Sequence, residues 1–136
     1  MRRFLPGLAL LALLLACDKD DSPTGPPGPP ATLDEAMRLW QSFGIQDYQV
    51  DQHHGCYCPP PRDWTATVRN GEVQGLGMSI DQLFAQMQMA QHDADHFEAT
   101  YDATYGYPTQ VYIDWSVGMA DDESDWTLSN FSRLVR

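Results

Sequence analysis

Two segments of the chain carry apolar residues at the spacing of a helix. The apolar positions follow the i, i+3, i+4, i+7 pattern of one buried helical face: Leu33, Ala36, Met37 and Trp40 in the first segment, Ile80, Leu83, Phe84 and Met87 in the second. Both segments begin with a capping box, in which a hydroxyl residue precedes Glu or Gln by three positions, at Thr32–Glu35 and at Ser79–Gln82. We therefore predict helices over residues 33–42 and 80–91.

Several shorter segments alternate between apolar and polar residues, which is the pattern of a half-buried strand. The clearest pair lies at residues 64–69 and 72–74, because Asn70-Gly71 between them suits a hairpin turn whose positions need positive φ. The same alternation predicts strands at residues 47–51, 96–101 and 110–115 and a short last strand around residues 126–128.

The order of these elements favours an α+β fold. A helix precedes three strands and a second helix precedes two or three more, so the pattern lacks the βαβ crossovers that a parallel sheet needs. We expect an antiparallel sheet of about five strands with two amphipathic helices packed on one face.

The amino-terminal residues have the features of a lipoprotein signal peptide. Two arginines precede an apolar run at residues 4–15, which is shorter than the roughly 20 residues of a membrane span. The run ends in Leu14-Leu15-Ala16-Cys17, which resembles the lipobox of bacterial lipoproteins. The resemblance implies that residues 1–16 are removed and that Cys17 carries acyl chains. The alternative is an ordinary secretory signal cleaved near Ala16.

Residues 17–31 predict a tether, and residues 32–136 predict a single domain. Prolines and glycines dominate the tether and favour an extended spacer that cannot form a core. We therefore expect an exported protein of the bacterial envelope that is anchored to a membrane through Cys17. The leaflet stays open, because Asp18 only resembles a retention signal of some Gram-negative bacteria.

The composition is acidic, with 8 basic and 19 acidic side chains and a net charge of −11. Removing Arg2 and Arg3 with the signal peptide leaves a mature protein with a net charge of −13. Such a surface repels the phosphates of nucleic acid, so we expect no nucleic-acid partner. It leaves cationic ligands, metal ions or an envelope protein as partners, or simply serves solubility.

The densest group of chemically reactive residues is His53-His54-Gly55-Cys56-Tyr57-Cys58. In an extended segment the side chains of His54, Cys56 and Cys58 share one face, and His53 lies on the other. Two sulfurs and an imidazole could hold copper or zinc. A structural zinc site, however, takes four ligands and usually has two to four residues between its cysteines.

A disulfide between Cys56 and Cys58 is the competing interpretation. The envelope is oxidising, and lipidation of Cys17 leaves these two thiols. Residues i and i+2 of a strand lie about 6.6 Å apart, near the upper limit for a disulfide, so a bend would be needed. Gly55 and Pro59-Pro60-Pro61 could supply it. Free thiols or an intermolecular bridge remain a third alternative.

Two other groups of polar residues are weaker candidates. His92 and His96 have the spacing of metal ligands on a helix, but the strand pattern begins between them. Residues 121–125 are acidic but lack the spacing of an EF-hand calcium loop, so we interpret them as a polar loop.

Short motifs in a fixed order resemble a known family, the bacterial lipoprotein domain catalogued as domain of unknown function 6174. The motifs are Tyr48, Cys56-Tyr57-Cys58-Pro59, Val68-Arg69-Asn70-Gly71-Glu72-Val73, Ile80-Asp81-Gln82-Leu83-Phe84, Tyr101-Asp102, Gly106-Tyr107-Pro108 and Ile113-Asp114. The resemblance implies an exported location and a small α+β fold, and it brings no activity and no catalytic residues. We expect a non-enzymatic binding or structural module; the alternative is a thiol-redox or soft-metal site at Cys56 and Cys58.

Overall fold

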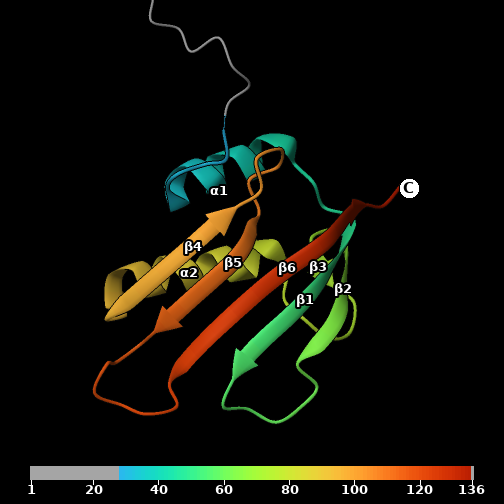
Figure 1. Cartoon of the computed structure of the whole chain (residues 1–136). Coiled ribbons are helices and arrows are strands. Elements are labelled where there is room, and N and C mark those ends of the chain that lie inside the picture. Colours follow the sequence, from blue (N-terminus) through green and yellow to red (C-terminus); the bar gives the residue numbers. More distant parts are fainter. Residues whose placement is uncertain (1–27, 136) are drawn as a thin grey trace, which may run out of the picture.

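A computed structural model describes residues 28–135 of the chain (Figure 1). The predicted signal peptide, Cys17 and most of the tether lie outside the described residues. Within residues 28–135 no helix is both long and apolar enough to cross a membrane. The elements in chain order are α1 (Leu33–Phe43), β1 (Tyr48–Cys56), β2 (Asp63–Arg69), β3 (Glu72–Val73), α2 (Ile80–Asp93), β4 (His96–Tyr101), β5 (Pro108–Asp114) and β6 (Glu123–Arg133).

All the strands join one antiparallel sheet in the order β3-β2-β1-β6-β5-β4. The sheet has six strands, one more than the approximate number predicted, and the α+β class is confirmed. The hairpin predicted at Asn70-Gly71 joins β2 to β3, and both turn residues have positive φ. The last strand, β6, lies between β1 and β5, so the two halves of the chain meet at the centre of the sheet.

The prediction for β6 was too short. The strand has 11 residues and takes in Glu123 and Asp125, which we had expected in a polar loop. β6 lies between β1 and β5, so its backbone groups form hydrogen bonds on both sides whatever side chains it carries. Its polar side chains alternate with the buried ones and point to the open face. A bulge at Asn130, whose φ is 51°, adds one residue relative to β1 and turns Phe131 toward the helices.

Both helices begin with the predicted capping boxes, at Thr32 and at Ser79. In Figure 1, α2 crosses behind the sheet, and α1 lies beside it at the end where the described chain begins. The buried side chains of the helices and of alternate strand positions form one core on this side of the sheet, which includes Trp40, Tyr48, Val50, Ile80, Leu83, Met87, Ile113 and Trp126. Among the described residues no helix covers the opposite face, which carries the polar strand positions (Figure 1).

Candidate functional site

The candidate site lies where β1 ends and the β1–β2 loop begins. β1 continues five residues beyond the predicted strand, as far as Cys56. This extension keeps the alternation of the strand, so His54 and Cys56 point to the helix side and His53 to the open face, as the sequence predicted. The backbone amide of His54 donates to the carbonyl of Arg62 at 2.8 Å and closes the loop that contains Cys58.

The structure brings the sulfur atoms of Cys56 and Cys58 into bonding contact. Their Cα atoms are 5.2 Å apart, which is within the range of disulfides and shorter than the about 6.6 Å of a regular strand. The bend comes where β1 ends at Cys56. The guanidinium of Arg62 donates to the carbonyl of Cys58 at 3.0 Å and so holds the far side of the bend. Both cysteines are half-buried, and Tyr57 between them is 83% exposed.

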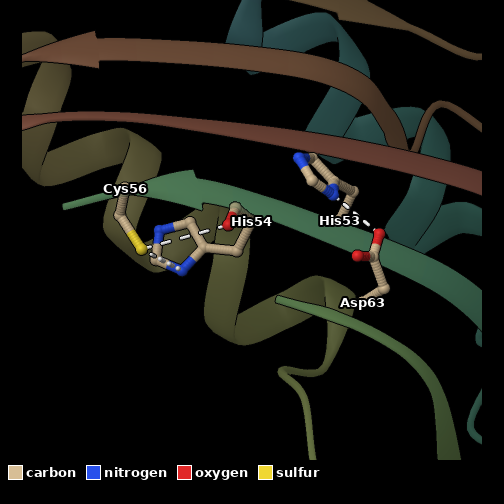
Figure 2. Close-up of polar contacts among 4 residues, drawn as sticks. All are labelled: His53, His54, Cys56 and Asp63. Carbon is tan, nitrogen blue, oxygen red and sulfur yellow. Dashed lines mark hydrogen bonds and ion pairs between the residues drawn. The ribbon is translucent and has the colours of Figure 1, made fainter. Parts of the chain in front are cut away.

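The imidazole of His54 forms one side of this site (Figure 2). Its Nδ1 atom lies 3.5 Å from the Sγ atom of Cys56. The ring stacks on Trp126, with centroids 3.9 Å apart and planes inclined by 13°. The Nε2 atom is buried and has no hydrogen-bond partner among the residues the structure describes. Burial lowers the pKa of His54, and the nearby Asp125 carboxylate opposes this shift only in part, so the ring is neutral at neutral pH.

The ligating atoms of His54, Cys56 and Cys58 all lie within 4.8 Å of one another. Within residues 28–135 no other cluster of three or more His, Cys, Asp or Glu side chains has the arrangement of a metal site. His92 and His96, the other candidate metal ligands, do not share a helix, because α2 ends at Asp93 and His96 begins β4. The acidic residues 121–125 are divided between a loop and β6.

A buried glutamine supports the site from behind. Gln52 is 2% exposed, and its side chain makes three hydrogen bonds. Its Nε2 donates to the carbonyl of Met78 at 2.7 Å, while its Oε1 accepts from the indole of Trp64 at 2.7 Å and from the amide of Met78 at 3.0 Å. Trp64 in turn packs edge-on against Trp126, the indole on which the His54 ring stacks. Gln52 was not predicted from the sequence as a functional residue, although its position two residues after Val50 marks it as facing the core.

On the open face, His53 pairs with Asp63 across the β1–β2 ladder (Figure 2). The His53 Nδ1 and Asp63 Oδ1 atoms are 2.7 Å apart, and both side chains are largely exposed. They border a shallow groove of about 410 Å³ that is also lined by Asp51, Thr65, Thr127 and Ser129. This pair was not predicted from the sequence, because only the register of the two strands brings Asp63 opposite His53.

Gly55 lies between His54 and Cys56 in β1, and its position has no room for a side chain. A Cβ atom there would collide with the carboxylate of Asp125, the residue opposite Gly55 on β6. The glycine therefore lets the Asp125 carboxylate lie against the backbone of β1 between His54 and Cys56. Because Gly55 alternates with His54 and Cys56, this carboxylate lies on the open face, and its charge acts on the His54 imidazole from across the strand.

The model of one protein family matches the chain over residues 32–78 and 74–133. It describes a family of unknown function, DUF6174, and the match covers almost the whole described domain. The chain belongs to this family. The family resemblance predicted from the short motifs is thereby confirmed, and the cysteine pair lies inside the first matched stretch. No curated protein and no solved structure matches the chain.

Proposed function

We propose that this DUF6174 protein is a lipid-anchored protein of the bacterial envelope whose Cys56–Cys58 pair is a reversible thiol–disulfide site. The sequence left two functions open, a non-enzymatic binding or structural module and a thiol or soft-metal site. The arrangement around the cysteines favours the second. The contact between the two sulfurs, beside an imidazole and under only partial burial, is the observation that carries the proposal.

A purely structural disulfide explains the cysteine pair poorly. A crosslink stabilises a protein mainly by restricting the unfolded chain, and its effect grows with the length of the loop that it closes. A loop of three residues gives at most about 1.6 kcal/mol, compared with about 3 kcal/mol for a loop of 15 residues. Tightly closed and accessible disulfides are also the ones that thiols reduce most readily. Exchange with a partner thiol is therefore the better use of this pair.

The chemistry needs one partner dithiol and no cofactor. A partner thiolate attacks one sulfur of the Cys56–Cys58 bond and forms a mixed disulfide, while the other sulfur leaves as a thiolate. The second partner thiolate then resolves the mixed disulfide, so the partner is oxidised and both cysteines are reduced. In the tautomer that carries its proton on Nδ1, His54 can donate to the Cys56 sulfur and stabilise the leaving thiolate.

The position of the pair in the domain suits a membrane-anchored protein. In Figure 1 the described chain begins next to α1, and the β1–β2 loop lies at the opposite end of the sheet. An acyl anchor at Cys17 would therefore join the domain at the end farther from the cysteines and would not cover them. Partners in the surrounding aqueous compartment could then reach them.

We would test this with the full chain purified from membranes in detergent. After equilibration in buffers of graded glutathione potential, alkylation and intact mass measurement should reveal a two-electron transition above about −300 mV, the value below which structural disulfides lie. The variant in which both Cys56 and Cys58 are serine should keep its far-ultraviolet circular dichroism and show no transition. A pair that resists reduction, or loss of the fold in the double variant, would argue for a structural bond.

Anchoring is tested separately with Cys17. A Cys17→Ser variant should leave the membrane fraction and lose incorporation of labelled fatty acid, because acyl chains supply the membrane affinity. Retention of the variant in membranes would contradict the lipoprotein assignment. It would leave the thiol–disulfide proposal unaffected.

A further inference from the structure

We infer that reduction of the Cys56–Cys58 pair creates a binding site for Cu(I), formed by the two sulfurs and the imidazole of His54. This inference rests on the proposed thiol–disulfide function, because the metal can bind only to the reduced pair. Oxidation of the pair would expel the ion. The site would thus couple metal binding to the redox state of the envelope.

The spacing between the His54 imidazole and the Cys56 sulfur suits two ligands of one metal. Metal bonds of about 2.3 Å to sulfur and 2.05 Å to nitrogen put the two ligand atoms about 3.6 Å apart at a tetrahedral angle and about 3.8 Å apart at the trigonal angle of a three-ligand site. The Nδ1 atom of His54 and the Sγ atom of Cys56 are 3.5 Å apart in the structure. The ligating atoms of all three residues, including Cys58, lie within 4.8 Å of one another.

The sulfurs must separate for the metal to bind, and reduction allows this. Two sulfurs on a common metal lie about 3.8 Å apart, farther than in a disulfide. Cys56 is held in β1, whereas Cys58 lies in the loop that follows the strand. A rotation of the Cys58 side chain is therefore the simplest way to open the site.

The imidazole is already oriented for binding. Its ring is stacked on Trp126, which is 4% exposed and packs against Trp64. Because the ring is held in place before the metal arrives, less rotamer freedom is lost on binding. The Nε2 atom of His54 has no hydrogen-bond partner among the described residues, so neither tautomer of the ring is fixed by a contact at Nε2. In the tautomer that carries its proton on Nε2, the lone pair of Nδ1 is free to bind the metal.

The ligand set favours Cu(I) over zinc. Thiolate and imidazole are ligands that soft metals prefer, and structural zinc sites take four ligands, whereas this cluster supplies three. Cu(I) accepts fewer ligands than zinc. The Asp125 carboxylate lies over Gly55 on the open face, outside the ligand cluster, and its negative charge acts on the His54 ring only from across the strand.

Cu(I) binds after a two-electron reduction of the cysteine pair. A partner dithiol gives two electrons and two protons to the Cys56–Cys58 bond and becomes a disulfide, which leaves two thiols on this protein. Cu(I) then displaces the two thiol protons, which pass to solvent, and the neutral imidazole adds its lone pair without losing a proton. The bound ion and its ligands carry one net negative charge.

The test uses the full chain, reduced with a phosphine under anaerobic conditions and titrated with Cu(I) against a chromogenic Cu(I) chelator. We expect one Cu(I) per reduced chain, a thiolate-to-copper charge-transfer band, and no binding by the oxidised chain. His54→Ala should weaken binding by at least about tenfold. His53→Ala is the matched control, because His53 lies on the opposite face of β1, and it should bind as the parent chain does.

Three results would overturn the inference. They are a reduced chain that holds no Cu(I), equal affinity in the His54→Ala and His53→Ala variants, and a preference for zinc over Cu(I). These results can be separated from failure of the proposed function, because the glutathione titration needs no metal. A reversible disulfide without Cu(I) binding would refute only the metal site. Cu(I) binding by a pair that never forms a disulfide would refute the thiol–disulfide function and the redox coupling.

Discussion

Replacing Gln52 with leucine tests the support of the candidate site. The substitution keeps the approximate volume of the side chain but removes all three of its hydrogen bonds. It leaves the amide and carbonyl of Met78 and the indole of Trp64 without their partners. Because Trp64 packs against Trp126, the same change loosens the surface on which His54 stacks.

The expected loss of stability follows from these three groups. A buried polar group without a partner costs about 1–3 kcal/mol. Met78 and Trp64 are only half-buried, so water can reach them in part and the lower end of this range applies. We expect Gln52→Leu to lower the free energy of unfolding by about 3 kcal/mol, which is a large share of the 5–15 kcal/mol typical of a domain.

Urea unfolding followed by circular dichroism measures this loss. Gln49→Leu is the matched control, since Gln49 lies three positions earlier in β1 on the open face and donates one hydrogen bond, to Thr67 at 3.0 Å. It should cost less than about 1 kcal/mol. A loss below about 1 kcal/mol in Gln52→Leu, or equal losses in the two variants, would refute the assigned role of Gln52.

Three further predictions concern the fold. Gly106 has a φ of 81°, and a Cβ atom there would lie 2.6 Å from the Ala36 carbonyl oxygen. Gly106→Ala should therefore lower the free energy of unfolding in urea by at least about 2 kcal/mol. The control is Gly118→Ala, whose Cβ meets open space and which should change this free energy by no more than about 0.5 kcal/mol. Ser79→Ala removes the cap of α2 and should lower the stability by about 1 kcal/mol in the same assay; no change would contradict the capping box. Burial raises the pKa of Tyr101 to about 12, so the stability that its neutral phenol contributes is complete below about pH 10 and is lost as the pH rises through 12. In urea unfolding at alkaline pH, Tyr101→Phe should make the free energy of unfolding fall less steeply with pH. An unaltered slope would refute this prediction.

Much of the local structure could be predicted from the sequence. The capping boxes at Thr32 and Ser79 and the Asn70-Gly71 turn are read within a few neighbouring residues, because they depend on contacts that the local backbone makes with itself. The division of the cysteine segment between two faces also followed from sequence, since side chains alternate in any strand. The sequence could not show how far β1 extends, because the Gly55 region pairs only through β6.

The tertiary structure decided which distant residues meet. Trp126 is 72 positions after His54 in the chain and yet supports its ring, because β6 pairs with β1 rather than with β5 alone. The pairing of His53 with Asp63 depends on the register of β1 and β2. Local patterns state which face of an element is apolar, and many strand orders satisfy that requirement. Only the packing of the whole core selects one order and register, and that selection puts His54 beside the cysteines with an indole behind it.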